Sequence, residues 1–248
     1  MDALKREVDA NFVRFTDSWT TELSSVIKEI DTDNGKFVES YRRLVSLQAW
    51  KSELLERALG SGALSFFTEA QNDGLSSHVL ARVGAWRSAL KSLRSCIENT
   101  MAAMYYKDHP IELRLWEQGK HKVGFTELSG YFEKHPDVSG TDRTVTGLDI
   151  LEKEYGTLSR AVHGSATSFR MTSGDKTLLW SPDRAKLGAW STRESQVIRG
   201  VNLLCLSLFK DEVSGVRHSN LRKAISLAIP LSLHTRIRTS LGIALSRP

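Results

Sequence analysis

Arg160 and His163 are the most reactive pairing of side chains in the sequence, within the segment YGTLSRAVHGS at residues 155–165. A spacing of three residues places both side chains on nearly the same face of a helix. Histidine exchanges a proton near neutral pH, while arginine keeps its charge. Such a pair can cleave RNA without a metal, with His163 taking the ribose 2′-hydroxyl proton and Arg160 stabilising charge on the phosphate. The competing interpretation is structural, because a histidine in the last turn before Gly164 also serves as a helix cap.

Arg94 and Glu98 form a second pair, four residues apart on another predicted helix. An ion pair at this spacing usually lies on the surface and stabilises a helix by about 0.2–0.5 kcal/mol. The pair gains a functional interpretation only if its helix packs against the helix that carries Arg160 and His163.

The sequence lacks the familiar motifs for metal and cofactor chemistry. It contains no Gly-rich phosphate loop followed by lysine, no paired CxxC, no HExxH and no nucleophile elbow. The seven histidines show no metal-ligand spacing with cysteines or carboxylates. We therefore expect no metal site and no cofactor.

Helical periodicity dominates the chain and predicts a mainly α fold. Apolar residues recur every three or four positions from Leu4 to Ile30, which predicts one long amphipathic helix. The segment DTDNG at 31–35 is expected to turn the chain into a second helix over 37–58. The two helices would form an antiparallel hairpin, with the long first stripe packed on the second helix and also across a homodimer.

The rest of the chain predicts further helices and a single β-hairpin. After a short helix at 63–70, a turn at NDG and a cap at Ser76 or Ser77 predict a third long helix that ends at His109. A change to short apolar runs around SGDK predicts a β-hairpin near 168–181. Further helices are expected near 111–118, 126–134, 147–163, 190–212, 219–230 and 232–245.

Composition limits the class of protein. A chain of 248 residues with 40% hydrophobic content forms one large domain or two small ones, and no apolar run is long enough to cross a membrane. Cys96 and Cys205 fall in amphipathic helices, which is typical of buried, reduced thiols and predicts a cytoplasmic protein. We expect an N-terminal hairpin at 1–62, a helical domain at 63–216 and a basic helical segment at 217–248, or all three as one domain.

Positive charge is concentrated at the end of the chain. The net charge is +5, yet no acidic residue follows Glu212, so six cations after it leave the first 212 residues at about −1. A polyanion such as RNA and a plain solvated helix face both explain this tail. The candidate RNA-binding residues of the tail are Arg222, Lys223, Arg236 and Arg238.

Two segments together resemble the HEPN superfamily (higher eukaryotes and prokaryotes nucleotide-binding). They are SLRSCIENTMAAMYYKDHPIE at 92–112 and, some fifty residues later, YGTLSRAVHGS, and the resemblance covers roughly residues 76–215. It implies a four-helix core that dimerises so that two Arg–His pairs face a shared cleft. It also implies metal-independent endoribonuclease activity in bacterial antiviral-defence or toxin–antitoxin systems, with a partner protein.

By position, Arg160 and His163 match the catalytic pair of that superfamily. The usual pattern has four to six residues between the two, and this chain has two, so Arg94 is the alternative catalytic arginine. Glu98, Tyr155 and Ser159 are expected to contribute to the binding site. Three functions stay open: a metal-independent endoribonuclease, a non-catalytic module that binds RNA, a nucleotide or a protein, and a plain helical scaffold.

Overall fold

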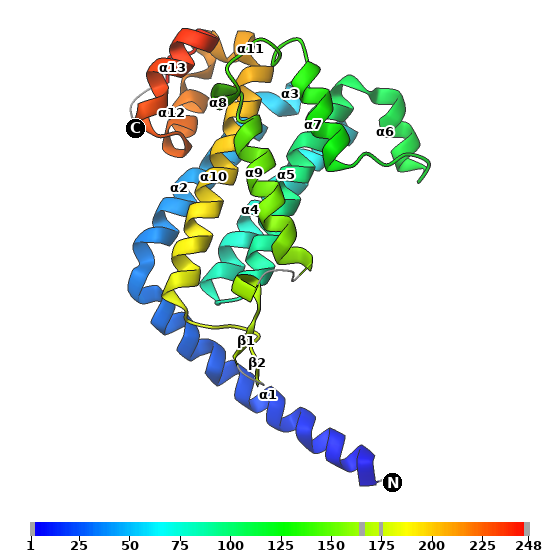
Figure 1. Ribbon diagram of the computed structural model, residues 1–248, viewed down its shortest axis with the longest axis vertical. Helices are drawn as coiled ribbons and strands as arrows, with labels where there is room; N and C mark the ends of the chain where they lie inside the picture. Colours follow the sequence, from blue (N-terminus) through cyan, green and yellow to red (C-terminus); the bar gives the residue numbers. More distant parts are fainter. Residues whose placement is uncertain (1–2, 164–166, 174–175, 246–248) are drawn as a thin grey trace.

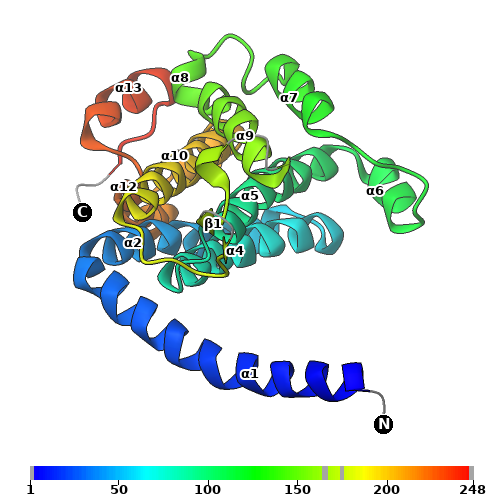
Figure 2. The same ribbon diagram turned by 60° about the horizontal axis from the view of Figure 1, so that its bottom comes forward.

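The computed structural model describes residues 3–163, 167–173 and 176–245, which are mainly helical, as the periodicity predicts (Figure 1). Helix α4 packs along α5, and α5 in turn packs against α9 and α10. Helix α2 lies against α4 and α10, which completes a bundle seen more nearly end-on in Figure 2. The central helices are α2 (Asn34–Trp50), α4 (Ser61–Arg82), α5 (Trp86–Asp108), α9 (Leu148–His163) and α10 (Arg184–Leu208).

Shorter elements surround this bundle. Strand β1 (Thr172–Ser173) pairs antiparallel with β2 (Lys176–Thr177), inside the range where a hairpin is predicted, while residues 174–175 lie outside the described residues. A π-helical segment at Lys51–Leu55 and α3 (Glu56–Ala58) prolong α2. The other short helices are α6 (Pro110–Glu117), α7 (Phe125–Lys134), α8 (Arg143–Thr146), α11 (Lys210–Ser214), α12 (Ser219–Ala228) and α13 (Leu231–Leu241), with 3₁₀ turns at Asp31–Asp33, Thr167–Phe169 and Val216–His218.

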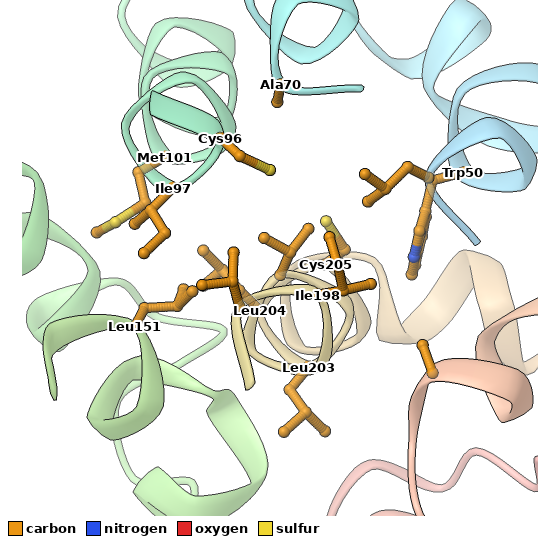
Figure 3. Packing of buried hydrophobic residues seen from close by; sticks show 14 of the residues in the cluster. Trp50, Ala70, Cys96, Ile97, Met101, Leu151, Ile198, Leu203, Leu204 and Cys205 are labelled. Atoms are coloured by element: carbon orange, nitrogen blue, oxygen red, sulfur yellow. The ribbon is translucent and has the colours of Figure 1, made fainter. Parts of the chain in front are cut away.

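The core lies where α5 meets α10 (Figure 3). Side chains of Ile97 and Met101 on α5 and of Ile198 and Leu204 on α10 are fully buried. Apolar burial of this kind stabilises a fold by about 25 cal/mol per Å² removed from water. The predicted apolar stripes of these two helices are therefore the surfaces that hold the bundle together.

Three polar contacts fix the register of α2 against α10 inside this core. Trp50 donates its indole N–H to Oδ1 of Asn202 at 2.9 Å, and Nδ2 of Asn202 donates to the Ser46 hydroxyl at 2.8 Å. One turn earlier on α2 and about two turns earlier on α10, Nε of Arg43 donates to Oε2 of the fully buried Glu194 at 2.8 Å. A sliding of α2 along α10 would leave these buried groups unpaired, at a cost of about 1–3 kcal/mol each.

The predicted N-terminal hairpin is wrong. Helix α1 (Ala3–Ile30) does not fold back along α2 but projects from the bundle as an arm (Figure 1). A 3₁₀ turn joins the two helices, so DTDNG redirects the chain without reversing it. The half of α1 nearest the bundle is partly covered: Ile30 is buried, and Val26 packs against the core. Further out, the Trp19 ring lies 6.0 Å from the ring of Trp180, centre to centre.

The predicted boundary between the next two helices is also wrong. Asn72, Asp73 and Gly74 lie inside α4, which runs unbroken from Ser61 to Arg82. Gly74 serves close packing rather than a turn, because a Cβ there would lie 2.9 Å from Cδ2 of Leu44 on α2. The break comes instead at Gly84, whose φ of +72° and whose approach to the Ser181 backbone admit only glycine.

None of the described helices is long and apolar enough to span a lipid bilayer. Helix α12 from the basic C-terminal segment packs against α2, and α13 packs against α8. The division of the chain into three segments stays a prediction, and these contacts favour the alternative of one domain.

Candidate functional site

Helix α9 carries the predicted Arg–His pair, and its start is fixed by Gly147. This residue has a φ of +77°, and a Cβ on it would lie 2.5 Å from the carbonyl oxygen of Gly200 on α10. Only glycine can turn the chain this close to a neighbouring backbone. The expected beginning of this helix near Gly147 is confirmed, and its position against α10 follows from that contact.

Arg160 and His163 lie together on the last turn of α9, and both side chains are exposed. Within the part of the chain that the structure describes, neither side chain makes a hydrogen bond or an ion pair. Gly164, which is predicted to end the helix, lies outside the described residues. The pair is therefore accessible to a ligand from solvent.

Arg87 on α5 caps the end of α9. Its Nε donates to the Ala161 carbonyl at 3.0 Å, and its Nη2 donates to the Val162 carbonyl at 2.9 Å. These carbonyls belong to the last turn, which has no intrahelical donors for them. The capping role considered for His163 is thus performed by an arginine from another helix.

Arg94, Glu98 and Tyr155 form a hydrogen-bonded trio between α5 and α9. Nη2 of Arg94 donates to Oε1 of Glu98 at 2.9 Å and to the Tyr155 hydroxyl at 2.6 Å, and that hydroxyl donates to Oε1 of Glu98 at 3.0 Å. The Arg94 guanidinium also lies 4.7 Å from the centre of the Tyr155 ring, on which Phe125 stacks. Burial raises the pKa of the Tyr155 hydroxyl, so it stays a donor at neutral pH.

The Arg94–Glu98 pair was expected to matter for function only if its helix packs against the helix of Arg160 and His163. That condition is met, because α5 packs directly against α9. The trio uses Nη2 of Arg94, while Nε of this arginine is buried without a hydrogen-bond partner among the described residues. Ser159 donates its hydroxyl to the Tyr155 carbonyl within α9. Arg94, Glu98 and Tyr155 therefore join the two helices, whereas Arg160 and His163 face solvent.

Helices α12 and α13, which carry the basic residues of the tail, lie at the opposite end of the bundle from the C-terminal turn of α9 (Figure 1). Helix α9 runs from α8, which contacts α13, to the turn that carries His163, over 16 residues or about 24 Å. Arg222 donates to the carbonyls of Val213 and Gly215, and Arg236 donates to the Thr144 hydroxyl. Lys223 and Arg238 are exposed. The structure thus separates the tail from the Arg–His pair.

A pocket of about 200 Å³ opens between α5, α10 and the segment that follows α9. The sequence analysis did not identify it. Its walls combine apolar side chains with three cations, and none of its lining residues is acidic. Lining residues are Trp86, Leu90, Phe169, Met171, Ala189 and Trp190 on the apolar side, and Arg87, Lys186 and Arg193 on the charged side.

The cations of the pocket are held in place by neighbouring groups. Arg193 donates Nη1 to both oxygens of Glu154 on α9, at 2.8 and 3.1 Å, while Lys186 donates to the Arg170 carbonyl at 3.1 Å. Burial raises the pKa of the Glu154 carboxyl, and Arg193 opposes that rise. A sequence signal for the pocket does exist, because Lys186 and Arg193 are two helical turns apart and share one face of α10.

The described residues contain no group of three or more His, Cys, Asp or Glu side chains placed to hold a metal ion. Comparison of the chain with protein-family models, with curated proteins and with solved structures finds no match. The functional argument therefore depends on the residues at the end of α9 and on the pocket beside them.

Proposed function

We propose that this protein is a HEPN-like effector that cleaves RNA without a metal ion at the C-terminal turn of α9. One observation carries the proposal: Arg160 and His163 are both exposed, share one helical turn and have no partner among the described residues. The bundle of α4, α5, α9 and α10 supports the HEPN-like fold. The resemblance places the activity in bacterial antiviral defence or a toxin–antitoxin system, restrained by a partner protein in the cytoplasm.

In this reaction His163 takes the proton from a ribose 2′-hydroxyl, and the 2′-oxygen attacks the adjacent phosphorus. The bond from phosphorus to the 5′-oxygen breaks, and that oxygen leaves as a hydroxyl after receiving a proton from water or from protonated His163. The products carry a 2′,3′-cyclic phosphate and a 5′-hydroxyl. Arg160 stabilises the negative charge that gathers on the phosphate oxygens. Arg94 positions α9 through Tyr155 instead of touching RNA.

The second candidate is a non-catalytic module that binds RNA, a nucleotide or a protein. The engagement of Arg94 with Glu98 and Tyr155 favours this candidate, because it removes the alternative catalytic arginine from the His163 turn. The spacing of two residues between Arg160 and His163 also departs from the superfamily pattern. Cleavage, measured directly, separates the two functions.

Helix α1 supports the homodimer of this proposal. Its 28 residues span about 42 Å, and Val8, Phe12 and Phe15 are each more than half exposed. A single amphipathic helix of this kind is marginal in water unless its apolar face is covered. Charge favours an antiparallel second copy, since residues 3–16 hold three cations and two carboxylates whereas residues 17–30 hold one cation and three carboxylates.

The proposal is tested by cleavage of single-stranded RNA in the presence of EDTA. The wild-type protein should release fragments with 2′,3′-cyclic phosphate ends, and His163→Ala should reduce the rate at least 100-fold. Arg160→Ala should also lose activity, while Lys153→Ala, another exposed cation on α9, should not. Cleavage that survives His163→Ala or stops on addition of EDTA would contradict the catalytic proposal and leave the binding module.

A further inference from the structure

The pocket beside the end of α9 has rigid aromatic walls. Trp86 donates its indole N–H to the Ser181 carbonyl at 2.8 Å, and Trp190 donates to the Ser77 hydroxyl at 3.0 Å. Both indoles are almost fully buried, so they form a fixed floor and expose little ring face themselves. Phe169, which is only partly buried, adds the ring that a ligand can reach. An aromatic ring above a rigid floor binds a flat, unsaturated group by stacking.

The charged side of the pocket keeps hydrogen-bond donors available. Arg87 uses Nε and Nη2 on the end of α9, which leaves Nη1, and Arg193 uses Nη1 on Glu154, which leaves Nε and Nη2. Lys186 contributes a third cation at the same pocket. With no acidic lining residue, the pocket attracts an anion, and guanidinium groups suit phosphate in particular.

The size and position of the pocket restrict the class of ligand further. Its 200 Å³ is below the range of roughly 300–1,000 Å³ for sites that enclose a drug-sized molecule, so it fits one small ring system. Arg87 lines the pocket and also holds the carbonyl of Val162, the residue directly before His163. A ring in this pocket therefore lies next to the turn proposed to act on RNA.

We infer that this pocket receives one unpaired nucleobase of the RNA, with the adjoining phosphate bound by Arg87, Lys186 and Arg193. The inference rests on the proposed RNA function and adds to it the site that selects which nucleotide is presented to His163. Proteins read single-stranded RNA in this manner, by stacking splayed bases on aromatic side chains and pairing their phosphates with arginine.

The first test blocks the pocket without disturbing the core. Ala189 lies exposed at the pocket, and Ala189→Phe would fill it. Binding of a fluorescent single-stranded oligoribonucleotide, measured by polarisation in EDTA, should weaken at least tenfold. Thr192→Phe, an exposed position one turn further along α10 and outside the pocket lining, should stay within twofold of wild type. Equal binding by Ala189→Phe and wild type would overturn the inference.

The second test determines whether the base contributes to binding and whether the ligand is RNA or a free nucleotide. AMP should bind at least tenfold more tightly than ribose 5-phosphate, and the oligoribonucleotide should bind more tightly than AMP. Equal affinity for AMP and ribose 5-phosphate would refute a base pocket, and tighter binding of AMP than of the oligoribonucleotide would replace RNA by a free nucleotide. Lys186→Gln should weaken oligoribonucleotide binding and lower its salt dependence by about one counterion.

These measurements separate the pocket from the catalytic proposal. Lys153→Ala, an exposed cation on α9 outside both the pocket and the Arg–His pair, should bind the oligoribonucleotide within twofold of wild type. A protein that binds through the pocket yet never cleaves would contradict catalysis and leave the base pocket intact. If the wild-type protein cleaves RNA while Ala189→Phe keeps the wild-type RNA affinity and base preference, the base pocket would be contradicted and the catalytic proposal would remain.

Discussion

The contrast between Arg94 and His163 shows how similar sequence signals acquire different roles. Arg94 holds Glu98 and Tyr155 across two helices, while His163 extends into solvent. Arg94→Ala should lower the free energy of unfolding by about 0.5–1.5 kcal/mol, because it removes the hydrogen bonds that join half-buried groups of α5 and α9. His163→Ala should change it by less than about 0.5 kcal/mol. Urea denaturation at pH 7 measures both, with the exposed Arg114→Ala as a control.

Glu194 gives the stability of the bundle a pH dependence. Its carboxyl is fully buried, Oε1 has no hydrogen-bond partner among the described residues, and burial raises the pKa from 4.5 to about 7 although Arg43 opposes the rise. An acid with a raised pKa in the folded state favours folding when protonated. Its contribution is therefore complete below about pH 4.5 and is lost as the pH rises through about 7.

Glu194→Gln should remove this part of the pH dependence. The wild-type protein should lose stability between pH 5 and pH 7 with a slope of up to about 1.4 kcal/mol per pH unit from this group, and the variant should show a flatter profile. Thermal unfolding across this pH range gives the comparison. Glu56→Gln, which alters an exposed carboxyl, should follow the wild type, and a variant profile parallel to the wild type would contradict the prediction.

Residue-scale prediction from sequence succeeded only for local pairs. The Arg94–Glu98 contact follows from a spacing of four residues, which a helix brings together in any context. Arg43 and Glu194 are 151 positions apart, and the Arg87 cap joins residues 74 and 75 positions apart. Contacts of this range depend on how helices cross, which a single sequence does not encode in any periodicity. The pocket was missed for the same reason.

At the scale of elements, two glycines of the α9 region should respond oppositely to alanine. Gly147→Ala should destabilise the protein by at least about 1–3 kcal/mol, because the new Cβ would meet the Gly200 backbone and the residue has positive φ. Gly156→Ala lies in the interior of α9 with open space around it and should stabilise by about 0.5–1 kcal/mol. Chemical denaturation of the two variants decides, and a shift of the same sign in both would contradict this account.

Helix existence was predictable and helix boundaries were less so. The ends of α5 at His109–Pro110 and of α9 at Gly147 agree with the sequence, since proline and positive-φ glycine leave the backbone few choices. The NDG segment predicted a turn and lies within α4, where packing on α2 outweighs the low helix propensity of Asn, Asp and Gly. Gly84 carried the true break without a neighbouring proline to mark it.

At the scale of the whole molecule, the α1 arm should control assembly. Its apolar positions repeat every 11 residues, from Val8 to Trp19 and from Phe12 to Leu23, a period of 3.67 that favours pairing in a right-handed supercoil. Multi-angle light scattering should therefore show a dimer for the wild type and a monomer for Phe12→Asp. Ala10→Asp, on the opposite face of α1, should remain dimeric, and a monomeric wild type at high concentration would contradict the dimer.

Cys96 and Cys205 can report how often the packed core opens. Both thiols are free and fully buried on the facing helices α5 and α10, and burial raises the pKa of each (Figure 3). Because only an exposed thiolate reacts with an alkylating reagent, each thiol becomes modifiable when α5 and α10 separate. The ratio of labelling rates in the native and denatured protein therefore gives the equilibrium constant for opening. Equal ratios at the two sites would mean that the bundle opens as one cooperative unit. Mass spectrometry can follow the labelling of both thiols in dilute extracts without any introduced probe.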